Sequence, residues 1–188
     1  YVDRPVHVQA WVLARDPRRD LAIIRLERIP PGVQSLPLAE AEPAVGAKVH
    51  SLGNSGTAGK PWRSGRMWSY KAGKVQKVVP FRVGGDKDGK YRYEAGLIDT
   101  DTGVMPGDSG GPMVNGLGQI IGVVAMGSFK EDKRSSAISL TELRSFLKDL
   151  GRRSPPSEQT LVGTWKYTLP TAKGNIHLRV TFRPDGKL

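Results

Sequence analysis

Apolar residues recur at every second position, or in short unbroken runs, along most of the first part of this 188-residue chain. Such stretches cover residues 6–12, 21–26, 47–52, 66–70, 75–83, 91–99 and 119–126, and glycine or proline bounds most of them. A period of two places successive side chains on opposite faces, which is typical of a half-buried strand. Many short strands with no helix between them predict an all-β barrel or sandwich.

One segment near residue 140 has a helical pattern instead. Ser139 and Glu142 have the spacing of a capping box, in which each side chain binds a backbone N–H group of the first turn. Leucines then recur at helical spacing, at positions 140, 143, 147 and 150. Gly151 is a natural end for such a helix. The sequence therefore predicts one helix, which closes the strand-rich part of the chain.

The residues after this helix differ in composition. Residues 151–159 contain two consecutive prolines and are typical of a linker. Strand patterns follow at 161–167 and 177–182. Because about thirty residues are too few for a stable domain, residues 160–188 are expected to begin a second, β-rich domain. Residues 1–150 form the first domain in this division.

The composition excludes several classes of function. The chain has 29 Lys and Arg against 18 Asp and Glu, a net charge of +11, and no cysteine. The lack of cysteine excludes a disulfide scaffold, a thiolate zinc site and a cysteine nucleophile. There is no His-Glu-x-x-His zinc motif, and no apolar run reaches the ~18 residues of a membrane span. We expect no metal, no cofactor and no transmembrane segment within these residues.

The most specific local signal is the hexapeptide Gly107-Asp108-Ser109-Gly110-Gly111-Pro112. At average residue frequencies it would arise in such a chain with a probability on the order of 10⁻⁵. A serine nucleophile needs an exposed hydroxyl and nearby backbone N–H groups that face a developing oxyanion. Glycines permit backbone angles that leave such N–H groups outside secondary structure. The motif therefore favours Ser109 as a nucleophile over an incidental serine in a glycine-rich turn.

Residues 97–112 resemble the nucleophile segment of chymotrypsin-like serine peptidases, and most closely of their bacterial HtrA-type branch. Residues 20–25 are similar to the acid-bearing strand of that branch, and residues 46–56 to its strand-and-glycine segment. Residues 118–123 resemble its substrate-flanking strand, and 137–150 its closing strand and helix. The resemblance covers roughly residues 1–150. It implies two six-stranded antiparallel β-barrels, the first of them incomplete in this sequence, and serine endopeptidase activity.

The resemblance also implies roles for individual residues. Ser109 would be the nucleophile, and the backbone N–H groups of Gly107 and Ser109, on either side of Asp108, would form the oxyanion hole. Asp20 would orient the general-base histidine and stabilise its imidazolium form. The HtrA branch commonly has asparagine where Asp108 stands. Aspartate is commoner in the trypsin branch, where it helps to organise the oxyanion hole.

Further positions concern the substrate, which the resemblance implies is a protein or peptide. Ala125, Met126 and Gly127 would lie along the substrate backbone, with Met126 and Val104 near the first specificity pocket. The trypsin branch prefers Arg or Lys through a carboxylate six residues before the nucleophile. Gly103 occupies that position here, so a small or medium apolar side chain is the expected preference.

The sequence does not supply the general base. The chain order in the family is His, Asp, Ser, with the histidine several tens of residues before the aspartate. Only His7 precedes Asp20, and it lies within a predicted strand, whereas His50 and His177 follow Asp20. The base is therefore expected upstream of residue 1, and the 188-residue segment alone is expected to be inactive. The resemblance implies a periplasmic or extracellular location, which the residues themselves leave open.

The trailing residues do not resemble the PDZ domain that often follows in HtrA proteins. Gly163 and Trp165 are faintly similar to the start of lipocalin-like barrels. A core tryptophan in any β-domain explains them equally well, so this second domain has no assigned identity.

Two other functions stay open at the level of sequence. A peptidase-like barrel without its base would bind peptides or a partner and cleave nothing. The positive charge also suggests a nucleic-acid binder, because basic and aromatic residues are interleaved in one segment. They are Trp62, Arg63, Arg66, Trp68, Tyr70, Lys71, Lys74 and Lys77. A solvated loop is the commoner origin of such a run, so nucleic acid is the least favoured partner.

Overall fold

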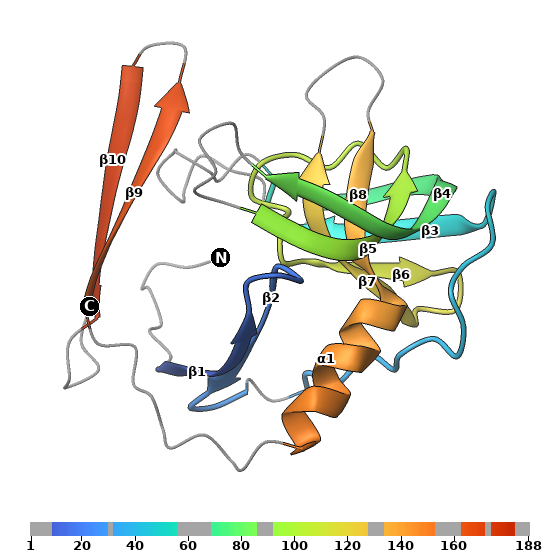
Figure 1. Ribbon diagram of the computed structural model, residues 1–188, viewed down its shortest axis with the longest axis horizontal. Helices are drawn as coiled ribbons and strands as arrows, with labels where there is room; N and C mark the ends of the chain where they lie inside the picture. The colour runs from blue at the N-terminus through green and yellow to red at the C-terminus, as the bar shows by residue number, and fades with distance from the viewer. Residues whose placement is uncertain are drawn as a thin grey trace. The chain divides into compact units, whose positions relative to one another are not determined.

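Six antiparallel strands close into a barrel in the order β3-β4-β5-β8-β7-β6 (Figure 1). They are β3 (Lys48–Gly53), β4 (Ser69–Gly85), β5 (Arg92–Thr100), β6 (Pro112–Asn115), β7 (Ile120–Gly127) and β8 (Ser135–Ser139). This computed structural model describes residues 9–29, 32–55, 69–85, 92–127, 134–152, 163–171 and 174–182. The barrel closes where β6, which begins at the last residue of the glycine-rich motif, pairs with β3.

Strand β4 is longer than the sequence predicts. Two separate strands were expected at 66–70 and 75–83, but one strand runs continuously over Ser69–Gly85, and residues 66–68 lie outside the described ranges. Register shifts against β5 fall between Val75 and Lys77 and between Val79 and Arg82. Such irregularities bend a strand without ending it. The predicted break at residues 71–74 has another cause: these residues are Lys, Ala, Gly and Lys, which lack an apolar alternation, yet they pair with β3 in unbroken register.

The barrel interior is filled by the inward-facing half of the alternating side chains. Val49, Val75, Ile98 and Met113 are at most 1% exposed and belong to one apolar cluster. Burying a side chain of this size stabilises the fold by about 1.5–3 kcal/mol. The predicted all-β class is therefore confirmed, with alternation as its physical cause.

Helix α1 (Leu140–Arg152) follows β8 without a break and packs beside β7 (Figure 1). The Glu142 N–H donates to the Ser139 hydroxyl over 3.4 Å, which is one half of the predicted capping box. The Glu142 carboxylate does not complete the box, because it accepts the Gly96 N–H on β5 over 2.9 Å. The helix ends at Arg152, one residue beyond the predicted end at Gly151. Glycine ends a helix only where its backbone adopts a left-handed conformation.

Strands β1 (Ala10–Asp16) and β2 (Leu21–Leu26) form a separate two-stranded sheet. The first strand was predicted at residues 6–12; residues 1–8 lie outside the described ranges, and the strand extends to Asp16. The turn Asp16–Leu21 belongs to one compact unit with residues 35–152, whereas residues 1–15, 22–34 and 153–188 make up a second unit. Within the first unit, the Glu94 N–H of β5 donates to the Arg18 carbonyl over 2.6 Å. This bond attaches the turn to the barrel.

Strands β9 (Gly163–Thr171) and β10 (Gly174–Phe182) pair antiparallel, Gly174 opposite Thr171 and Phe182 opposite Gly163. The two trailing strands predicted from the sequence are therefore present. The division into a peptidase domain, a linker and a second domain stays a prediction. Among the described helices, none is long and apolar enough to cross a membrane.

Candidate active site

A tight turn precedes Ser109. The Asp108 N–H donates to the Met105 carbonyl over 3.0 Å, and Gly107 has a φ of 100°. A proline followed by a residue of positive φ is the pattern of a type II turn, and Pro106 and Gly107 match it. Glycine is needed at 107 because other residues resist this left-handed region. The sequence Met105 to Asp108 thus determines the backbone path into the nucleophile position.

Ser109 is exposed and lies against the end of β7. Its Oγ donates to the Ala125 carbonyl over 3.3 Å. The Gly110 N–H donates to the Val124 carbonyl over 2.8 Å, and the Val124 N–H donates to the Gly111 carbonyl over 2.9 Å. These paired bonds fix the backbone just after Ser109 while its hydroxyl faces solvent.

Two backbone donors belong to the turn and to Ser109 itself. Within the part of the chain that the structure describes, neither the Gly107 N–H nor the Ser109 N–H donates to a protein atom. Backbone N–H groups normally find an acceptor, so two adjacent unpaired ones suit water or an anionic oxygen. Stabilising an oxyanion requires such preorganised donors. They are the same two groups that the family resemblance implies for the oxyanion hole.

Asp108 faces away from solvent and is 1% exposed. Its carboxylate accepts the Ser55 hydroxyl over 2.7 and 2.9 Å, the Met105 N–H over 2.7 Å, and the ammonium of Lys71. Burial alone would raise the pKa of Asp108, but the hydrogen bonds from Lys71, Met105 and Ser55 outweigh it and hold the pKa below its usual value. The carboxylate is therefore ionised and fully paired at neutral pH.

Asp20 is exposed at the end of the turn that leads into β2. Its φ is 55°, a left-handed value that few residues other than glycine adopt, aspartate among them. Burial raises the pKa of the neighbouring Tyr93, Arg82 opposes the rise, and the charges of Asp99 and Asp20 add to it. Asp20 therefore lies within electrostatic reach of the barrel wall. No hydrogen bond joins Asp20 to Ser109 among the described side chains.

The histidines have other surroundings. His50 Nδ1 shares a hydrogen bond of 2.6 Å with the Tyr70 hydroxyl, and the two rings stack with centroids 5.6 Å apart. His7 lies outside the described residues, and the side chain of His177 is not described. Of the histidine side chains in the described ranges, none hydrogen-bonds to Ser109 or Asp20.

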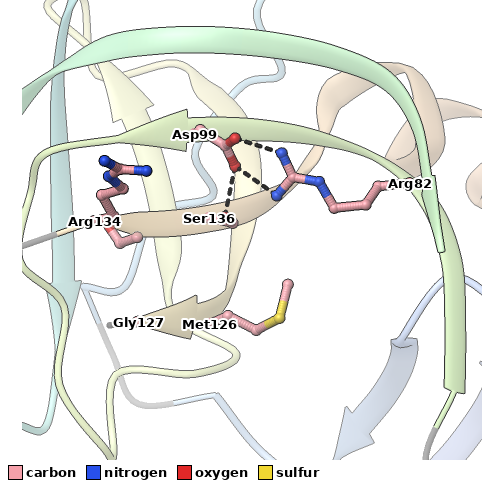
Figure 2. Close-up of a pocket in the computed structure, with 7 residues that line it drawn as sticks. Arg82, Asp99, Met126, Gly127, Arg134 and Ser136 are labelled. Atoms are coloured by element: carbon pink, nitrogen blue, oxygen red, sulfur yellow. Dashed lines mark hydrogen bonds and ion pairs between the residues drawn. The ribbon is translucent and has the colours of Figure 1, made fainter. Parts of the chain in front are cut away.

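A hollow of about 320 Å³ opens beside the end of β7 (Figure 2). It is lined by Arg82, Asp99, Met126, Gly127, Arg134, Ser135 and Ser136. Figure 2 shows Arg82 and Arg134 on either side of Asp99, with the Met126 side chain across the opening from them. Two of the four predicted substrate-contacting residues, Met126 and Gly127, therefore lie at one cavity.

Val104 and Ala125 do not line this hollow. Val104 is 3% exposed and belongs to the apolar core. A Cβ on Gly127 would lie 2.5 Å from the Val104 carbonyl oxygen, so the loop before Ser109 and the end of β7 are in contact at this point. Ala125 lies closer to Ser109, because its carbonyl accepts the Ser109 hydroxyl.

Neutral hydroxyl groups cluster beside Gly103. Thr100, Thr102 and Ser135 are buried and form a triangle of hydrogen bonds of 2.9, 2.9 and 2.6 Å. Each hydroxyl has its partners inside this triangle. The sequence position where the trypsin branch has a carboxylate is thus occupied by glycine and bordered by uncharged groups.

The basic segment considered for nucleic-acid binding is divided by the fold. Along β4, side chains alternate between the two faces, so Lys71 is largely buried whereas Lys74 is exposed. The Tyr70 hydroxyl is hydrogen-bonded to His50, and residues 56–68 lie outside the described ranges. In the described part, the predicted run does not form one continuous basic and aromatic face.

Comparisons with known proteins place the chain in a family. The model of the trypsin-like peptidase domain matches residues 3–123, which include both Asp20 and Ser109. The chain belongs to the trypsin-like peptidase family. This match, together with the relatives below, confirms the chymotrypsin-fold, HtrA-type resemblance found in the sequence.

Two relatives illustrate how far the similarity extends. The chain is 30% identical over 142 residues to a "serine protease HtrA-like" of Staphylococcus aureus strain USA300, and equally to that of strain NCTC 8325. Each match covers 74% of this chain and 18% of the relative. The trypsin-like peptidase chain thus spans less than a fifth of the length of these relatives.

Solved structures agree on the fold. The active form of the Rv3671c protease from M. tuberculosis superposes with a TM-score of 0.64 at 24% identity, over 83% of this chain and 63% of that one. The inactive form of Rv3671c protease gives a TM-score of 0.61 at 24% identity, over 80% and 70%. The similarity confirms the chymotrypsin-like fold of the trypsin-like peptidase chain.

Several residues around the motif were not predicted from the sequence. Lys71 and Ser55 bind Asp108, and Arg82 binds Asp99, across large sequence separations. The one available signal was the alternation of β4, which places Lys71 on the same face as the buried Val75. A lysine on a buried face requires an acidic partner, but the pattern does not say which one.

Proposed function

We propose that this chain carries the nucleophile and the oxyanion hole of a serine endopeptidase, with Ser109 as the attacking residue. One observation supports this above the others: an exposed serine hydroxyl directly follows a type II turn whose Gly107 and Ser109 N–H groups have no protein acceptor in the described part. These groups stabilise negative charge where attack on a carbonyl would create it. The substrate class is protein or peptide, as expected of the family.

The chemistry follows from these positions. Ser109 Oγ forms a bond to the carbonyl carbon of the substrate, and its proton passes to the general base. The carbonyl oxygen becomes an oxyanion that accepts the N–H groups of Gly107 and Ser109. The C–N bond then breaks, the base returns its proton to the departing amine, and an acyl-enzyme remains. Water hydrolyses the ester by the same steps and restores Ser109.

The general base in this proposal is a histidine that precedes Asp20 in the chain order of the family. Asp20 accepts the second N–H of its ring and holds the orientation. The left-handed backbone at Asp20 and the bond from the Glu94 N–H to the Arg18 carbonyl support a fixed position for the turn that carries this carboxylate. The segment 1–188 alone, which lacks such a histidine in the expected place, is expected to be inactive.

Substrate binding is proposed along residues 125–127. Met126 and Gly127 pair with β8 on one side, and on the other side no described strand pairs with residues 125–127. An extended peptide adds to such a free edge through backbone hydrogen bonds. Substrate side chains would then alternate between the Val104 side and the hollow beside Met126. The neutral surroundings of Gly103 favour a small or medium apolar residue at the cleaved bond.

The test is proteolysis by the full-length protein and its Ser109→Ala variant. We expect the substitution to reduce peptide cleavage by at least about 10⁴-fold with fold and stability unchanged. Ser35→Ala, at an exposed serine outside the motif, is the matched control and should cleave like the wild type. Cleavage that persists in Ser109→Ala would refute the assignment.

A second candidate is a peptide-binding module without catalysis. It is favoured by one observation: on the side away from β8, no described strand pairs with residues 125–127, so this edge can bind an extended peptide whether or not Ser109 is activated. In that case the wild type and Ser109→Ala would bind a peptide with equal affinity, and neither would cleave it. Turnover by the full-length wild type decides for the enzyme.

A further inference from the structure

Lys71 lies far from the nucleophile motif in sequence but contacts it directly. It stands on β4 opposite Ser51 of β3. Its ammonium binds both the Asp108 carboxylate and the Ser55 hydroxyl. The Lys71 side chain is 17% exposed and that of Asp108 only 2%. A nearly buried ion pair, bridged by a serine, therefore anchors the residue between the two oxyanion-hole N–H groups.

A carboxylate this deeply buried is unfavourable unless it is paired and hydrogen-bonded. Of its three partners, Met105 belongs to the same turn, whereas Ser55 and Lys71 come from the β3–β4 side of the barrel. Lys71 is the one partner among them that neutralises the charge. Without Lys71, a buried net charge would remain, and the Asp108 side chain would favour an orientation toward water.

The orientation of Asp108 determines the shape of the turn. Its N–H closes the turn on the Met105 carbonyl, and its carboxylate accepts the Met105 N–H, so the two residues are joined twice. The chain also leaves space for this carboxylate: a Cβ on Gly53 would lie 2.4 Å from Asp108 Oδ1. Rotation of Asp108 outward would break the carboxylate bond and free the peptide units around Gly107.

We propose that Lys71, assisted by Ser55, is a positioning residue that holds Asp108 inside the barrel and thereby keeps the Gly107 and Ser109 N–H groups aimed at the oxyanion. The cation comes from a barrel strand, so the oxyanion hole forms when the barrel folds. The catalytic consequence rests on the proposed function, whereas the positioning of the turn does not.

The kinetic test compares Lys71→Met with Lys48→Met in the full-length protein. Lys48 is an exposed lysine on the neighbouring strand β3 and serves as the matched control. We expect Lys71→Met to lower kcat about 10²-fold with a smaller change in KM, because the loss is in the transition state. Lys71→Arg, which keeps the charge, should restore part of the activity.

A double variant separates positioning from general damage. In Lys71→Met with Asp108→Asn, no unpaired charge is buried, so kcat should rise at least about tenfold above that of Lys71→Met alone. A double variant no better than the single one would contradict the ion-pair argument. Lys71→Met with wild-type kcat would overturn the inference as well.

A structural readout works even without catalysis. The backbone amide NMR resonances of Gly107 and Ser109 should shift in Lys71→Met and stay in place in Lys48→Met. Ser55→Ala removes one neutral bond and gives a smaller shift in the same residues, which keeps the test valid if Lys71→Met does not fold. If the full-length wild type cleaves no peptide, the proposed function fails. The role of Lys71 is judged separately, and it is rejected if the Gly107 and Ser109 amide resonances stay in place in both Lys71→Met and Ser55→Ala.

Discussion

The Asp99 carboxylate is held by two neighbours in the wall of the hollow. Arg82 donates to it over 3.1 and 2.5 Å, and the Ser136 hydroxyl over 2.6 Å (Figure 2). Burial would raise the pKa of Asp99, but Arg82 and Ser136 hold it below its usual value. A carboxyl group whose pKa is lowered by folding stabilises the native state above about pH 4, and this stabilisation is lost as the pH falls through the folded-state pKa.

Replacing Arg82 tests this link between a residue and acid stability. We expect Arg82→Met to lower the free energy of unfolding at pH 7 by about 1 kcal/mol, since the pair is only partly exposed. The fall in stability below about pH 4 should become shallower, because the pKa of Asp99 is then closer to its unfolded value. Urea denaturation at several pH values measures both effects. Arg92→Met, at an exposed partner of Glu94, is the control, and an unchanged acid slope in Arg82→Met would contradict the prediction.

At the scale of elements, Arg19 joins the turn before β2 to helix α1. Its guanidinium donates to Asp16 over 2.7 Å, Glu142 over 2.9 Å, Ser145 over 3.1 Å and Asp149 over 3.2 Å. Arg19 stands next to the predicted acid Asp20. The network therefore connects the position of that turn to the helix that follows the barrel.

Removing the Arg19 guanidinium should loosen this turn. We expect Arg19→Met to lower the free energy of unfolding by about 1–2 kcal/mol, because several partly buried partners lose one cation. Hydrogen exchange at the Glu94 N–H, which bonds to the Arg18 carbonyl, should become faster through local opening. Arg18→Met removes an exposed side chain with one ion pair and should change stability by less than about 0.5 kcal/mol. Equal exchange in the wild type and Arg19→Met would show that the turn is held by other contacts.

The sequence predicts elements well where one local rule decides them. Alternation located β2, β3, β5 and β7 within about two residues, and capping with leucine spacing located α1. Strand β6 was not predicted, because four residues that begin at the last residue of a glycine-rich motif are too few to establish a period. The length of β4 was wrong because residues 71–74, Lys-Ala-Gly-Lys, carry no apolar alternation although they pair regularly with β3.

At the scale of the whole molecule, the candidate site divides into a local part and a distant part. The type II turn at Met105–Asp108 and Ser109 come from consecutive residues, so both depend on local sequence, and the hexapeptide alone predicts the role of the serine. Asp108 and Lys71 are 37 positions apart, and their pairing depends on the closure of the barrel. No local pattern encodes such a contact. In the sequence Lys71 is one member of a basic run, whereas in the closed barrel it is the counter-ion of the buried Asp108 carboxylate.

The proposed peptidase activity requires that Ser109 is an activated nucleophile. The most direct measurement is mass-spectrometric mapping of the adduct that a fluorophosphonate leaves on the full-length protein. We predict a single adduct on the peptide that contains Ser109, blocked by prior incubation with a peptide substrate. No adduct at Ser109, or an adduct at another serine with equal yield, would contradict the assignment.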